Sequence, residues 1–207
     1  VGIVDRPAMI GPARVQDGDV LIGLASSGLH SNGYSLARKV CTEDKTLYEL
    51  TIARDELEGD SVLDALLEPT RIYVKSIRSV LLQCPGAIHS LAHITGGGIT
   101  ENLNRALPST LDAEIQVGSW NMVPILPWVC RAAHLNETEA LKTFNMGLGM
   151  ILAVAPQKAE EVAQLLADAG EEVYIVGQVV PGVGKVVYLD EEELFAAYSE
   201  DEEAEED

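Results

Sequence analysis

The chain has 207 residues, of which 47% are hydrophobic and only 5% aromatic, so we expect a core built mainly from Val, Leu, Ile and Ala. The formal net charge is −19, and 11 of the 33 acidic residues lie at 190–207, where there is no Lys or Arg. The other 22 acidic residues still outnumber the 14 basic ones. This balance argues against nucleic acid as a partner, and it predicts an acidic, disordered tail over 190–207.

The three cysteines, Cys41, Cys84 and Cys130, are far apart and show no CxxC or metal-ligand spacing. They are interpreted as reduced, mostly buried thiols of a cytoplasmic protein. No apolar run reaches the roughly 18 residues of a membrane span, and no signal peptide is recognisable. The chain begins with Val1, inside the apolar stretch VGIV, which favours a chain taken from a longer protein.

Apolar runs and helical periodicities alternate along the chain. VLIGLA, at 20–25, is typical of a buried strand, and an amphipathic helix follows from Gly33. Residues 42–60 are polar and irregular and are expected to form a surface excursion. Arg71 and Lys75 are interpreted as a solvated helical face. In chain order, further helices are expected at 61–69, 73–85, 97–107, 124–133, 137–144 and 159–170, and further strands at 87–94, 113–117, 147–155, 172–180 and 185–189.

Strands that alternate with helices predict one α/β (α+β) domain over residues 1–189, with a mixed sheet in two or three layers. Residues 1–19 are expected to be a linker or a first strand.

Two strand–loop–helix junctions carry the polar residues of interest, LASSGLHSNGYS (24–35) and AHITGGGITEN (92–102). Each places free N–H groups at a helix N-terminus, which favours an anion. His30 and His93 lie beside these loops and each can titrate near neutral pH. Neither phosphate fingerprint, GxxxxGK[ST] or GxGxxG, is present, and the residues alone leave open a plain glycine-rich turn.

Alternatives also remain for individual residues. His93 can equally be a satisfied histidine at a strand end, and Asn145 can simply cap a turn. His89 and His134 are interpreted as structural or exposed. The residues alone therefore predict an α/β domain with an anion-binding edge.

Four ordered segments carry a family resemblance: GDVLIGLASSGLHSNGYSLARKV, LLEPTRIYVKS, HITGGGITENLNRALP and TFNMGLGMILAV. Together they resemble the C-terminal domain of aminoimidazole ribonucleotide synthetase, also called phosphoribosylformylglycinamidine cyclo-ligase, over residues 1–189. The resemblance implies an ATP-dependent ring closure of formylglycinamidine ribonucleotide in purine synthesis. It also implies an absent N-terminal domain that binds most of the ATP and Mg, a homodimer, and a fragment that is inactive alone.

The resemblance also carries site residues over. His30 matches an active-site histidine and His93 is a second catalytic candidate. The family usually has Cys where Met146 stands, so a thiol role is excluded there. No metal ligand is assigned. A non-catalytic binding domain, or a kinase or synthetase domain of a related superfamily, remains the alternative. The expected substrate-binding residues are Ser26, Ser27, Gly28, Ser31, Asn32, Gly33, Thr95, Gly96, Gly97, Gly98 and Asn145.

Overall fold

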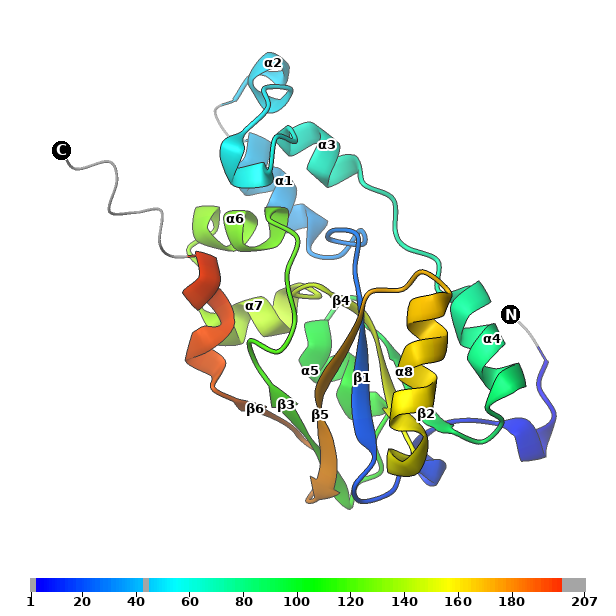
Figure 1. Ribbon diagram of the computed structural model, residues 1–207. Helices are drawn as coiled ribbons and strands as arrows, with labels where there is room; N and C mark the ends of the chain where they lie inside the picture. Colours follow the sequence, from blue (N-terminus) through cyan, green and yellow to red (C-terminus); the bar gives the residue numbers. More distant parts are fainter. Residues whose placement is uncertain (1–2, 43–44, 199–207) are drawn as a thin grey trace.

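A computed structural model describes residues 3–42 and 45–198 (Figure 1). These residues contain a six-stranded mixed sheet in the order β2-β4-β1-β5-β3-β6, in which only β3 and β6 are parallel neighbours. The predicted mixed sheet is therefore confirmed. The strands are β1 (Val20–Ala25), β2 (Ile88–His93), β3 (Leu111–Gln116), β4 (Leu148–Val154), β5 (Val173–Pro181) and β6 (Val186–Leu189).

Helices cover both faces of the sheet, so the domain has three layers (Figure 1). The smaller core lies under α4 and α8, and the larger core lies on the opposite face under the other long helices. The helices are α1 (Tyr34–Thr42), α2 (Leu47–Leu50), α3 (Val62–Leu67), α4 (Val74–Gln83), α5 (Gly98–Arg105), α6 (Ile125–Ala132), α7 (Glu137–Thr143) and α8 (Ala159–Asp168).

Strand β1 lies inside the sheet between β4 and β5. A strand covered on both faces needs apolar side chains on both, which is why VLIGLA is a continuous apolar run and does not alternate. Leu21 packs into the larger core, and Ile22 and Leu24 pack into the smaller one; all three are fully buried.

The expectation of a purely surface excursion over 42–60 is wrong in part. Helix α2 and a 3₁₀ turn at Asp55–Leu57 lie within it, and Leu50 and Leu57 are buried in the larger core. Charged side chains also pack here, because the ammonium of Lys45 and the guanidinium of Arg54 lie 5.1 and 5.8 Å from the ring centroid of Trp128. Two buried leucines in a polar stretch are too few to give a periodic signal.

The start of the chain agrees with one of the two expectations for it, a linker, whereas the acidic end differs in part from expectation. Residues 3–19 form two single 3₁₀ turns, Arg6–Ala8 and Pro12–Arg14, and no strand. Residues 191–198, inside the predicted disordered tail, form the 3₁₀ helix η5 (Glu191–Tyr198). Leu194 is only 4% exposed, so burial of this side chain anchors the start of the acidic segment despite its charge. The last part of the predicted tail, 199–207, lies outside the described residues.

Other expectations agree with the structure. Cys41, Cys84 and Cys130 are buried and unpaired. His89 is structural: its Nδ1 lies 2.8 Å from a carboxylate oxygen of the fully buried Asp19. In the described part of the chain, no helix has the length and apolar character needed to cross a membrane.

Strand directions bring the two junctions to one edge of the sheet. Strands β1 and β2 are both antiparallel to β4, which lies between them, so they run parallel to each other. Their C-terminal ends therefore meet at one edge, called here the site edge, where β4 begins. The loops that follow them, 26–33 and 94–97, both leave the sheet at the site edge, one on each side of the residues that lead into β4.

Candidate functional site at the site edge

Asn145, just before β4, holds the first loop in place. Its side-chain Nδ2 donates to the carbonyl of Gly28 (2.8 Å), and its Oδ1 accepts from the N–H of Gly147 (3.0 Å) and from Ser26 Oγ (3.3 Å). Asn145 is fully buried and Ser26 is 5% exposed. Both residues were expected to bind substrate, but their polar groups are used inside the protein. These hydrogen bonds shape the loop.

His30 joins the first loop to the segment before α4. Its Nε2 accepts a hydrogen bond from the backbone N–H of Ser27 (3.0 Å) and from that of Arg71 (3.3 Å). The hydroxyl of Ser27 lies 3.0 Å from the same nitrogen and donates to the carbonyl of Pro69 (2.7 Å). Because Nε2 accepts from two N–H groups, we assign the ring proton to Nδ1, which is buried and has no partner.

The environment of His30 favours the neutral ring. Burial is the main cause that lowers its pKa, with smaller contributions from His93 and Arg71, and the result is a pKa of about 4. Its backbone φ is 51°, and that of Ser31 is 60°, both in the left-handed region. Asn32 stabilises this turn by donating from Nδ2 to the carbonyl of His30 (2.9 Å). His30 is therefore built as a neutral support inside the loop.

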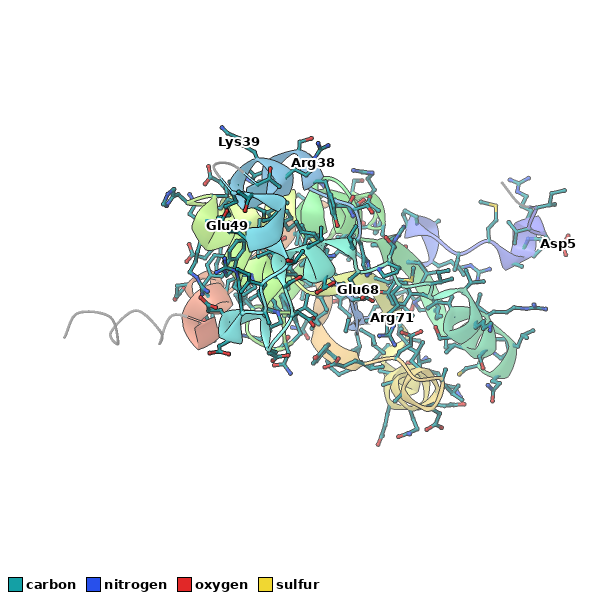
Figure 2. All side chains as sticks on the ribbon, turned by 90° about the horizontal axis from the view of Figure 1, so that it is seen from above. Asp5, Arg38, Lys39, Glu49, Glu68 and Arg71 are labelled. Atoms are coloured by element: carbon teal, nitrogen blue, oxygen red, sulfur yellow. The ribbon has the colours of Figure 1, made fainter. Side chains whose placement is uncertain are left out.

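Arg71 is not on a solvated face, so that interpretation is wrong. Its Nε donates to a carboxylate oxygen of Glu171 (2.8 Å), and its Nη2 donates to the carbonyl of Gly170 (2.6 Å). The other oxygen of Glu171, a residue 7% exposed at its side chain, accepts from Ser76 Oγ (2.5 Å). Figure 2 shows Arg71 on the chain between α3 and α4, close to Glu68. These hydrogen bonds fix the segment around Arg71, whose backbone N–H donates to His30.

The second loop is closed by Asn102 of α5, which the sequence analysis did not select. Its Nδ2 lies within hydrogen-bond distance of three loop carbonyls, those of Thr95 (3.2 Å), Gly96 (3.2 Å) and Gly98 (2.8 Å). The hydroxyl of Thr95 donates to Asn102 Oδ1 (3.2 Å). An Asn one helical turn after a glycine run is the signal that would have found it.

Most glycines of the two loops are required by packing. A Cβ on Gly33 would lie 2.3 Å from the ring of Phe144, and one on Gly98 would lie 2.0 Å from the carbonyl oxygen of Leu141. Gly97 is the N-cap of α5 with φ of 94°. In contrast, a Cβ on Gly96 would meet nothing within 4 Å. A Cβ on Gly28 would have only ordinary contacts, the nearest at 3.7 Å.

His93, the last residue of β2, is the accessible histidine of the site edge. It is exposed and lines two hollows: a groove of about 550 Å³ shared with Arg71 and Tyr73, and one of about 290 Å³ shared with Asn102. The hydroxyl of Tyr73 is buried and donates to the carbonyl of Ala25 (2.6 Å), so it braces the end of β1. The structure thus brings both candidate histidines to one edge, with different access to solvent.

The protein is therefore an α/β domain of the class that places two glycine-containing strand–loop–helix junctions side by side at one edge of a sheet. A family model described as AIR synthase related protein, C-terminal domain, matches residues 16–190. The chain therefore belongs to this family.

Curated relatives agree with this assignment. A phosphoribosylformylglycinamidine cyclo-ligase of Brevibacillus brevis is 49% identical over 188 residues, which cover 91% of this chain and 53% of the relative. One of Lactobacillus delbrueckii subsp. bulgaricus is 46% identical over 179 residues, covering 86% and 50%. The chain thus spans about half the length of the curated relatives it matches.

Solved structures support the fold alone. Thiamine-monophosphate kinase from Stenotrophomonas maltophilia matches with a TM-score of 0.58 at 16% identity, over 89% of this chain and 54% of that one. The hydrogenase maturation protein HypE of E. coli matches with a TM-score of 0.55 at 20% identity, over 87% and 49%.

Proposed function

We propose that this chain is the substrate-side half of an ATP-dependent cyclo-ligase. The reaction closes the imidazole ring of formylglycinamidine ribonucleotide and gives aminoimidazole ribonucleotide, ADP and phosphate. The observation that carries the proposal is the 49% identity to a relative of that name over 91% of this chain. The site edge supports the proposal as well. The four segments that carry the family resemblance meet there, and they supply both loops, Arg71 and Asn145.

In this proposal the two loops bind and orient the substrate. Ser31 and Gly96 are exposed, and their backbone N–H groups have no hydrogen-bond acceptor among the described residues. Such donors beside the N-termini of α1 and α5 suit the phosphate of a ribonucleotide. Ser27, Gly28, Asn32 and Thr95 define the shape of the loops that present these donors.

The two histidines take different roles. His93 is exposed beside the groove, and we assign it the contact with the reacting part of the substrate, where it holds or moves a proton. His30 supports the loop through its Nε2. Its Nδ1–H has no hydrogen-bond partner among the described residues and can still donate.

ATP and Mg are assigned to a preceding N-terminal domain. Among the described residues, no group of three His, Cys, Asp or Glu side chains is arranged to hold a metal ion. In this proposal no residue of this chain acts through Mg. Its own contribution is to bind the ribonucleotide, to exclude water and to orient the reacting groups. We also propose a cytoplasmic homodimer for the longer enzyme.

A chimera tests this function. The N-terminal half of the Brevibacillus brevis relative is fused to this chain, and ADP release is measured with and without formylglycinamidine ribonucleotide. We expect substrate-dependent turnover by the chimera and none by the chain alone. A chimera that folds but turns over only another substrate, or none, contradicts the proposal and favours a kinase-like or purely binding domain.

A further inference from the structure

Helix α4 exposes an unusual amount of apolar surface. Ile72, just before the helix, is 79% exposed, and Val74 and Leu82 are 69% and 71% exposed. Leu81 is 36% exposed. These four residues are called here the α4 face. Ile72, Val74 and Leu81 also line the groove of about 550 Å³, which is bounded on its sheet side by Leu91 and Met150.

The α4 face differs from ordinary surface in two ways. Isolated exposed hydrophobics are normal on a soluble domain, but a group of them beside an apolar groove marks an interaction site. Its charge is also opposite to that of the chain, because residues 70–83 contain no Asp or Glu in a protein of net charge −19. Lys75 and Arg78 are exposed there and make no ion pair with any described residue.

We propose that the α4 face docks the domain that precedes this one in the longer proteins of its family. The proposal rests on the proposed function only in that both assume such a domain. The matched family model describes a C-terminal domain, and the curated relatives are about twice as long. The part of these relatives that this chain does not match is thus about as large as this domain and is able to cover one whole face.

The path of the chain supports this occupant. The first described residues lie at the same end of the molecule as α4 in both views, where Figure 2 labels Asp5 (Figures 1 and 2). This segment is itself apolar and open to solvent, because Ile3, Val4 and Met9 are each more than half exposed. It is tied to the sheet by the N–H of Gly11, which donates to the carbonyl of His89 (2.8 Å). A preceding domain would therefore emerge beside α4.

The chemistry of the face specifies the partner surface. Its centre should be apolar to match Val74 and Leu82, and its rim should carry carboxylates to meet Lys75 and Arg78. His93 and Tyr73 line the same groove, so a domain seated there would also cover the site edge from one side. Docking would then complete the site and exclude water from it.

Hydrogen exchange of the chimera described above, compared with that of the chain alone, tests the proposal. We expect the amides of α4 to exchange at least about tenfold more slowly in the chimera. The double variant Val74→Lys and Leu82→Lys should return this rate to that of the chain alone. The matched control is Val183→Lys, at a residue 67% exposed in the turn after β5, and it should leave the protection intact.

The outcomes separate this proposal from the proposed function. An active chimera with unprotected α4 amides overturns the docking site and leaves the function standing. Protected α4 amides in an inactive chimera support the docking site and contradict the function. Light scattering of the chain alone is the last measurement. A dimer that dissociates in the double variant but not in the control would show that a second copy binds the α4 face, and it would overturn the proposal.

Discussion

The two loops of the site edge look alike in sequence but are held in different ways. The first, 26–33, is fixed by partners far away in the chain. Asn145 is hydrogen-bonded to Ser26 and Gly28, which lie 119 and 117 residues earlier. Ser27 is hydrogen-bonded to Pro69 and His30 to Arg71, which lie 42 and 41 residues later. The second, 94–97, is closed by Asn102, at most seven residues away from the loop carbonyls that it contacts. The first loop therefore depends on the whole domain, whereas the second is largely a local structure.

Each loop also has its own histidine, with opposite surroundings. His30 is 5% exposed and its Nε2 is occupied by backbone N–H groups, whereas His93 is exposed at the end of β2. The globally held loop thus contains a supporting histidine, and the locally held loop follows an accessible one.

The largest expected effect is on catalysis. In the active chimera, His93→Gln should lower kcat by about 10²–10⁴-fold, the usual contribution of a general acid or base, with little change in Tm because the residue is exposed. His30→Gln, the matched variant, should lower kcat by at most about tenfold once the folded fraction is corrected for, since Gln retains an acceptor for the two N–H groups. Steady-state kinetics and thermal melts on the same preparations show which histidine contributes to catalysis and which to stability. The reverse ranking of the two variants would assign the chemistry to His30.

The next effect compares two neighbouring glycines of the second loop. Gly98→Ala should lower the free energy of unfolding by about 3 kcal/mol or more, because its Cβ would lie 2.0 Å from a backbone oxygen and its φ is 61°. Gly96→Ala should change it by less than about 0.5 kcal/mol, since the Cβ meets open space. Urea unfolding measures both. Equal costs at the two positions would mean that the loop packs differently from the structure.

Two asparagines test whether the loops are held globally or locally. Asn145→Ala should cost about 2–4 kcal/mol, because it leaves the Gly28 carbonyl and the Gly147 N–H buried without a partner. Asn102→Ala should cost about 1–2 kcal/mol and should speed hydrogen exchange only in 95–102. Exchange measured by residue in both variants checks this. If Asn145→Ala also loosens no more than its own loop, the proposed difference between the loops is wrong.

The sequence predicts local features well and distant ones poorly. All six strands, and the helices after Gly33 and Gly97, follow from runs and periodicities that involve neighbouring residues. The role of Asn145 depends on β4 lying beside β1, and that of Arg71 depends on Glu171, 100 residues away. No pattern within either segment reveals such a pairing. Gly33 was predicted to bind substrate, and the structure adds a packing requirement that no local pattern reveals, because a Cβ there would lie 2.3 Å from the ring of Phe144.

The acidic end shows the same limit. Its composition predicts disorder, but the structure buries Leu194, and Thr138 donates to Glu191 (2.5 Å). One buried leucine among carboxylates has no periodicity from which an anchor could be inferred.

The smallest expected effect concerns the pH dependence of the first loop. The pKa of His30 is lowered to about 4 in the folded protein, against about 6.5 in the unfolded chain. Above pH 6.5 both states are neutral and the full stability is present. Between pH 6.5 and 4 the unfolded chain binds a proton that the folded protein does not, so stability falls as the pH is lowered. Between pH 7 and pH 5 the loss due to His30 should be roughly 1–2 kcal/mol.

His30→Gln isolates this contribution, because Gln does not titrate and all carboxylates remain common to both proteins. Urea unfolding of both proteins at pH 7, 6 and 5 gives the difference in free energy of unfolding at each pH. The variant should be at its greatest disadvantage at pH 7, and that disadvantage should shrink by roughly 1–2 kcal/mol by pH 5. A constant difference across this range would mean that His30 takes up a proton in the folded state as readily as in the unfolded one. Protonated, its ring would present N–H donors at both nitrogens, so Nε2 could not accept from Ser27 and Arg71, and the first loop would have to be held by its other contacts, those of Asn145 and of the Ser27 hydroxyl.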